Sequence, residues 1–108
     1  MVKDASELDL SFAALSHPVR RTIVERLASG PATVGEATFD LPVSKPAISK
    51  HVRVLEDAGV VVRAIEGRTH RLTLDRRPLT RASSWMERQR SLWERKLDVV
   101  GDYLEKTK

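Results

Sequence analysis

Residues 44–59, SKPAISKHVRVLEDAG, narrow the possible folds of this chain more than any other stretch. Ser44 carries a side-chain oxygen of the kind preferred at a helix start, Pro46 is tolerated in a first helical turn, and Gly59 is a common helix stop. At about 100° per residue one broad arc of this helix is mainly apolar. Its members are Ala47, Ile48, His51, Val52, Val54, Leu55 and Ala58. The stretch therefore predicts an amphipathic helix that packs through this arc onto the preceding helices.

The opposite side of this helix is basic near its N-terminus and acidic near its C-terminus. Phosphate would repel Glu56 and Asp57, so we expect the N-terminal half to enter a DNA major groove while the other end tilts away. The positive end of the helix dipole favours the same orientation. The candidate DNA contacts on this helix are Ser44, Lys45, Pro46, Ser49, Lys50 and Arg53. Lys50 and Arg53 are the strongest because both can bond to guanine. For Ser44 the role of a plain helix cap fits at least as well, and the two roles can coexist.

A β-hairpin is predicted directly after this helix. The β-branched run VVVRAI, the turn EGRT and the alternating HRLTL have the pattern of two strands around a glycine-containing turn. The candidate DNA contacts on this wing are Arg63, Arg68 and Arg71. Residues 44–81 hold nine Lys and Arg against four Asp and Glu, net +5, while the rest of the chain holds ten against eleven, net −1. A basic helix face alone is often only solvated, but together with this hairpin it indicates DNA binding.

Short helices are predicted before the amphipathic one. Residues 1–7 resemble a frayed start, and the apolar spacing that follows predicts a short helix. The sequence SHP at 16–18 starts a helix that runs to about residue 29, with Ser16 or His17 as its cap. TVGE at 33–36 has capping-box spacing and opens a short third helix.

The chain after the hairpin predicts one long helix, from about Pro78 to Glu105, in which Gly101 is the single helix breaker. Helix, short helix, turn, helix and hairpin is the order of a winged helix-turn-helix. We therefore expect a mainly α fold with a small β-hairpin, about five helices and a two-stranded wing, in a single domain over 1–108.

Three segments resemble the ArsR family of bacterial winged-helix repressors: SHPVRRTIVERL, VSKPAISKHVRVLEDAGVV and EGRTHRLTL. The resemblance covers residues 12–75, and the tail WMERQRSLWERKLDVVGDYL looks like the final helix of family members that lack metal sites. It implies a homodimeric autorepressor or a regulator of neighbouring genes. The segment GEATFD departs from the family, which more often has Leu-Ala after the Glu, and Phe39 is expected to fill that place.

Two apolar stripes predict a dimer. A domain this small cannot cover the stripe along its last helix, and the first helix presents another, so we expect an isologous interface that sets two recognition helices about one DNA turn apart. The predicted interface residues are Leu8, Phe12, Leu15, Trp85, Leu92, Trp93, Leu97, Val100 and Leu104.

The ligands of a transition-metal site are missing from the expected positions. The chain has no cysteine, residues 78–108 contain no histidine, and His17, His51 and His70 lie on separate predicted elements. Such a site needs convergent nitrogen or sulfur ligands, so we expect neither a metal nor a cofactor. The angle of His51 places it in the apolar arc, as a packed or boundary residue, and His70 is expected to face solvent or phosphate. The sequence does not decide whether either contacts DNA.

Other classes of function fit less well. An enzyme is not expected, because no nucleophile–base order, phosphate loop or paired buried carboxylates can be argued. A winged-helix module for protein–protein contact is the main alternative to an operator-binding regulator. The chain has no apolar run near the roughly 18 residues of a membrane span and no leader segment, so we expect a cytoplasmic protein without a membrane partner. The sequence does not identify an effector.

Overall fold

The computed structural model describes the backbone of residues 2–106 and the side chains of residues 6–106. The described part is mainly helical, with five helices and a small antiparallel sheet that includes a hairpin wing. The elements are α1 (Val2–Ala14), α2 (Pro18–Leu27), β1 (Ala32–Thr33), α3 (Val34–Ala37), α4 (Lys45–Asp57), β2 (Val61–Glu66), β3 (Thr69–Leu74) and α5 (Arg77–Lys106). This confirms the predicted winged helix-turn-helix.

The helix starts are fixed by the capping residues that the sequence suggests. His17 caps α2, and its Nδ1 accepts the backbone N–H of Val19 at 3.1 Å. Thr33 and Glu36 form a complete capping box on α3, with both reciprocal bonds present. Ser44 caps α4 by accepting the N–H of Ala47 at 3.3 Å. These bonds satisfy donors that a helix start leaves unpaired.

The core lies where α2, α4 and the sheet meet. The largest fully buried side chains are Ile23, Leu55, Leu72, Val52, Val60 and Val61. Each contributes about 1.5–3 kcal/mol through burial. Because Val52 and Leu55 point into this core, α4 presents the opposite side to solvent.

The sheet has three strands instead of the two expected. β3 is central, pairing with β2 along the whole hairpin and with the two-residue strand β1, where Ala32 faces Leu72 and Thr33 faces Arg71. Such a short strand carries no alternation in its sequence. It ties the segment before α3 to the base of the wing.

Two smaller expectations were wrong. Residues 2–7 are not a frayed start, because α1 begins at Val2 and packs against α4 and α5; Met1 lies outside the described residues. Phe39 does not fill a core position, since 75% of it is exposed. The turn there is held by its backbone, whose Phe39 carbonyl accepts a 2.7 Å bond from Arg26, and Asp40 adopts a positive φ of 61°.

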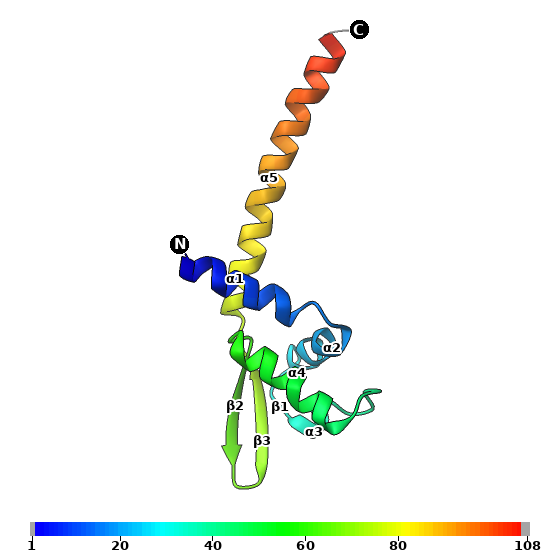
Figure 1. Cartoon of the computed structure of the whole chain (residues 1–108), viewed down its shortest axis with the longest axis vertical. Coiled ribbons are helices and arrows are strands. Elements are labelled where there is room, and N and C mark those ends of the chain that lie inside the picture. Colours follow the sequence, from blue (N-terminus) through cyan, green and yellow to red (C-terminus); the bar gives the residue numbers. More distant parts are fainter. Residues whose placement is uncertain (1, 107–108) are drawn as a thin grey trace.

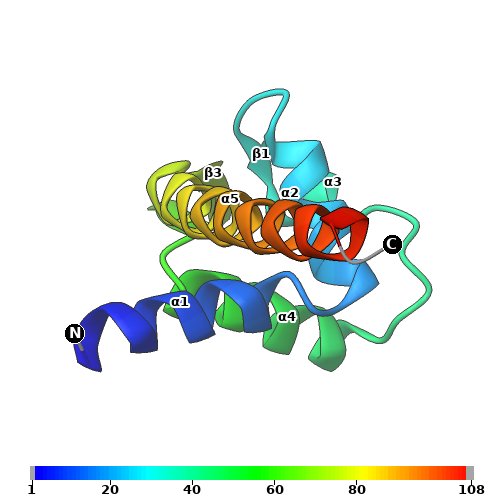
Figure 2. The same ribbon diagram turned by 90° about the horizontal axis from the view of Figure 1, so that it is seen from above.

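The molecule is elongated because α5 leaves the body (Figure 1). Its extents are 69 × 31 × 23 Å, and the buried residues of the 30-residue α5 are Pro78 and Ala82, both near its start. Helix α1 crosses the base of α5, and α4 lies beside α1 (Figures 1 and 2). Among the described residues, no helix is both long and apolar enough to cross a membrane.

Candidate nucleic-acid interface

The exposed side of α4 carries all six candidate contacts predicted on this helix. Each of them is exposed: Ser44, Lys45, Pro46, Ser49, Lys50 and Arg53. Helix α4 and the wing lie at the end of the molecule opposite the tip of α5 (Figure 1). The helix therefore offers a basic face at a free end of the protein, where a long polyanion can approach.

An open hollow of about 600 Å³ separates α4 from the wing. Ser49, Lys50 and Arg53 line it from α4, and Arg63 and His70 line it from the hairpin. Four of the nine predicted DNA contacts are thus brought to one concave surface.

Arg63 joins the wing to α4. Its Nε and Nη2 donate to the two carboxylate oxygens of Glu56 at 3.2 and 2.7 Å, and its Nη1 donates to Nδ1 of His70 at 2.8 Å. The hydrogen bonds to Glu56 raise the pKa of Arg63 above its ordinary value. The guanidinium neutralises an acidic residue that would otherwise repel phosphate. His70, expected to face solvent or phosphate, is half-buried and engages Arg63 through Nδ1.

The other two wing arginines occupy different surfaces. Arg68 is exposed at the tip, beside Gly67, whose φ of 62° the turn requires. Among the described residues it has no ion pair. Arg71 lies 3.9 Å from Glu66, and strand alternation turns it to the sheet face opposite His70. Arg71 therefore does not share the hollow.

His51 anchors α4 to α2. Its Nδ1 accepts a 2.9 Å bond from Arg20, and its ring lies 4.3 Å from that of His17. Burial lowers the pKa of His51, and the neighbouring His17 and Arg20 lower it further. The prediction of a packed or boundary histidine is confirmed. Arg20, which the sequence did not single out, also donates to the carbonyls of Ala13 and Ala14 at the end of α1.

The sequence analysis expected the three histidines to lie apart on separate elements, but His17 and His51 are in contact. A pair is still short of the three or more protein ligands of a typical zinc site. Within the described part of the chain, no three His, Asp or Glu side chains cluster in a way that could hold a metal ion.

The two predicted dimer stripes differ in exposure. Leu8 and Phe12 on α1 are half-buried, as is Leu15 directly after it, and Phe12 packs edge-on against Trp85 with ring centroids 5.8 Å apart. The predicted stripe on α5 is exposed throughout, and it reaches 65% exposure at Trp93. Further exposed apolar residues that the sequence analysis did not include are Leu10, Met86, Val99 and Tyr103.

Comparison with known proteins identifies relatives that share this architecture. A model of the "Helix-turn-helix domain" family matches residues 15–64. The HTH-type transcriptional regulator Rv2034 of Mycobacterium tuberculosis is 55% identical over 53 residues, which are 49% of this chain and 50% of that protein. The transcriptional repressor SdpR of Bacillus subtilis is 33% identical over 75 residues, 69% of this chain and 83% of that protein. The chain thus spans about half the length of the first relative and most of the second.

Solved structures agree with the sequence relatives. The crystal structure of an ArsR family transcriptional regulator superposes with a TM-score of 0.79 at 34% identity, covering 83% of this chain and 93% of that one. These relatives are transcriptional regulators rather than enzymes, and the family model that matches this chain is that of a helix-turn-helix domain. On its fold, its helix-turn-helix segment and these similarities, the chain belongs to the ArsR family of transcriptional regulators.

Proposed function

We propose that the chain is a homodimeric repressor that binds an imperfect DNA palindrome through α4 and the wing and responds to no metal ion. The observation that carries the proposal is the basic face of α4, with Ser49, Lys50 and Arg53 exposed beside the wing hollow. A helix of this kind fits a major groove, and the exposed Arg68 at the wing tip reaches the adjacent backbone or minor groove.

The dimer is supported by the exposed side of α5. A row of apolar side chains that includes two tryptophans is costly to leave in water. A second copy would cover it and would give the two recognition helices the two-fold symmetry of a palindrome.

Independence from metals is supported by the chemistry of the side chains. Thiolates are absent from the chain, and histidine is absent from residues 78–108. We expect zinc, nickel, copper and arsenite to leave the protein–operator complex intact in a titration followed by chelator. Stoichiometric release by one of them, reversed by chelator, would contradict this part of the proposal.

Selection of bound fragments from random DNA tests the proposal and defines the site. The expected product is one motif with two inverted half-sites. With roughly 6–10 phosphates contacted per dimer, affinity should fall about 10³–10⁵-fold between roughly 50 and 200 mM salt. Absence of any preferred sequence at moderate salt would favour the alternative, a winged-helix module for protein–protein contact.

A further inference from the structure

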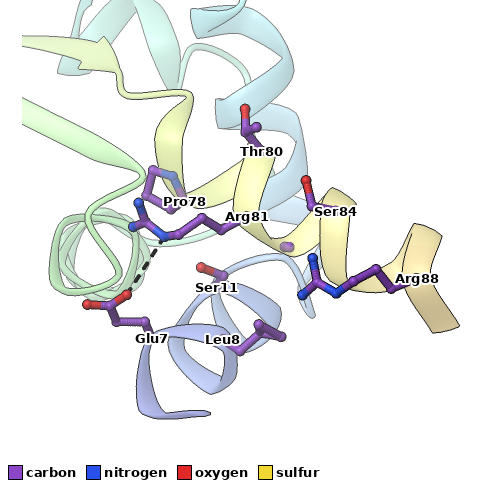
Figure 3. A pocket seen from close by; sticks show the side chains of 9 residues that line it. Glu7, Leu8, Ser11, Pro78, Thr80, Arg81, Ser84 and Arg88 are labelled. Carbon is purple, nitrogen blue, oxygen red and sulfur yellow. Dashed lines mark ion pairs between the residues drawn. The ribbon is translucent and has the colours of Figure 1, made fainter. Parts of the chain in front are cut away.

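A second hollow lies away from the basic face, between α1 and the base of α5. It measures about 280 Å³. Glu7, Leu8 and Ser11 line it from α1, and Pro78, Arg81 and Arg88 line it from α5 (Figure 3). The volume is just below the roughly 300 Å³ at which pockets for drug-sized ligands begin, so a small molecule would fill it.

Ser11 presents an unused hydroxyl to this hollow. Only 3% of the residue is exposed, yet its hydroxyl makes no hydrogen bond within the part of the chain that the structure describes. Among the described residues, every fully enclosed side-chain oxygen or nitrogen has a hydrogen-bond partner. The Ser11 hydroxyl has none, so it is not fully enclosed and opens into the hollow. Water can reach this hydroxyl through the hollow, and a ligand oxygen could accept its hydrogen bond in place of water.

The charges around the hollow favour an anion. Arg81 is held to Glu7 only by a loose contact of 3.7 Å from Nε to Oε2, and Arg88 has no ion pair among the described residues. Two guanidinium groups and one carboxylate thus line the hollow, and Asp75 lies near Arg81 outside this lining. Figure 3 shows Ser11 with Arg81 on one side and Arg88 on the other. Guanidinium groups bind carboxylates through two parallel hydrogen bonds.

The rest of the lining is apolar, with Leu8, Pro78 and Ala82 contributing carbon surface. We propose that this hollow is an effector site for a small organic acid. The acid's carboxylate lies between Arg88, Arg81 and the Ser11 hydroxyl, and its apolar body lies on Leu8 and Pro78. Inorganic anions would leave the apolar part unfilled, so they should bind more weakly.

Occupancy of the hollow would tie α1 to α5. Both helices carry the proposed dimer interface, so a ligand between them changes the relative placement of the two recognition helices. This regulatory step rests on the proposed function, whereas binding of the acid to the protein does not.

Isothermal titration of the DNA-free protein with octanoate tests the site. We expect saturable binding of one octanoate per chain and little binding of octan-1-ol, octylamine or inorganic phosphate. The affinity for octanoate should fall by roughly tenfold or more in Arg88→Gln and Ser11→Ala. Arg95→Gln is the matched control, because Arg95 lies two helical turns further along the same side of α5 and should bind octanoate like the wild type.

The outcomes separate this proposal from the DNA-binding one. No saturable heat with millimolar octanoate, in protein that binds its selected DNA, would overturn the effector site and leave the repressor proposal standing. Equal affinity in Arg88→Gln and Arg95→Gln would also overturn it. Octanoate binding by protein that selects no DNA sequence would retain the acid site and reject the repressor. Circular dichroism spectra of the variants show whether any loss reflects unfolding.

Discussion

Arg53 and Arg68 are both exposed and basic, but they lie on different parts of the molecule, Arg53 on α4 and Arg68 at the wing tip. In the proposed complex we expect Arg53 to reach base edges and Arg68 to contact phosphate. Arg53→Ala should cost roughly 1–3 kcal/mol of binding free energy and relax the preference at one base position per half-site. Arg68→Ala should weaken binding to all sequences alike. Titrations against the selected operator and its single-base variants measure both; a uniform loss in Arg53→Ala would assign that residue to phosphate.

His51 gives the contact between α4 and α2 a pH dependence. Its pKa is lowered from 6.5 because burial, His17 and Arg20 all disfavour the imidazolium. The unfolded chain therefore takes up this proton at a higher pH than the folded chain. The stability that neutral His51 gives the folded chain is complete above about pH 6.5, and it is lost as the pH falls toward the lower pKa of His51 in the folded state. The melting temperature of the wild type should fall more steeply between about pH 7 and 5.5 than that of His51→Gln. Parallel curves would contradict the assignment.

The residues that could be predicted from sequence are those whose role depends on their own helix. The exposed positions of Lys50 and Arg53 and the partial burial of His51 follow from helical angle alone. The bonds of Arg63 to Glu56 and of Arg20 to His51 join elements through tertiary packing. No spacing along the chain encodes such pairs.

Ser44 caps α4, and it is also a proposed DNA contact, so the two roles can be tested separately. As N-cap it accepts the Ala47 N–H, so Ser44→Ala should lower the free energy of unfolding by about 0.5–2 kcal/mol. Ser44→Asp keeps a capping oxygen and should retain most of this stability, but its charge should weaken DNA binding. Urea unfolding and operator titration of the two variants test the separation. Wild-type DNA affinity in Ser44→Asp would mean that this helix start lies away from phosphate.

Helices with caps, breakers and a clear apolar arc were predictable as elements, as α2, α4 and α5 illustrate. Strand β1 was not, because two residues have no periodicity and are strands only through pairing with β3. The start of α1 and the exposure of Phe39 also depend on packing. A helix or strand can be predicted from sequence when the residues that stabilise it lie within the element itself.

For the whole molecule, the length of α5 raises the question of what covers its exposed side. Most of its 30 residues extend beyond the body (Figure 1). Neither dimerisation nor the role of the α1 residues follows from the fold alone, since Phe12 and Trp85 already pack together within one chain. A second chain on α5 remains our prediction, and it can be tested at one residue.

Trp93 is the most informative position on this surface, because it is a large aromatic residue with 65% of its surface exposed and no role in the described core. Trp93→Ala should leave the melting temperature of the body nearly unchanged while weakening self-association in light scattering. Once the variant is monomeric, the loss of bivalency should weaken operator binding by roughly 10²–10⁴-fold. Arg95→Ala, on a side of α5 away from the apolar row, should associate and bind like the wild type. Wild-type protein that scatters light as a monomer at tens of micromolar would rule out this interface, and with it the arrangement of two recognition helices on one palindrome.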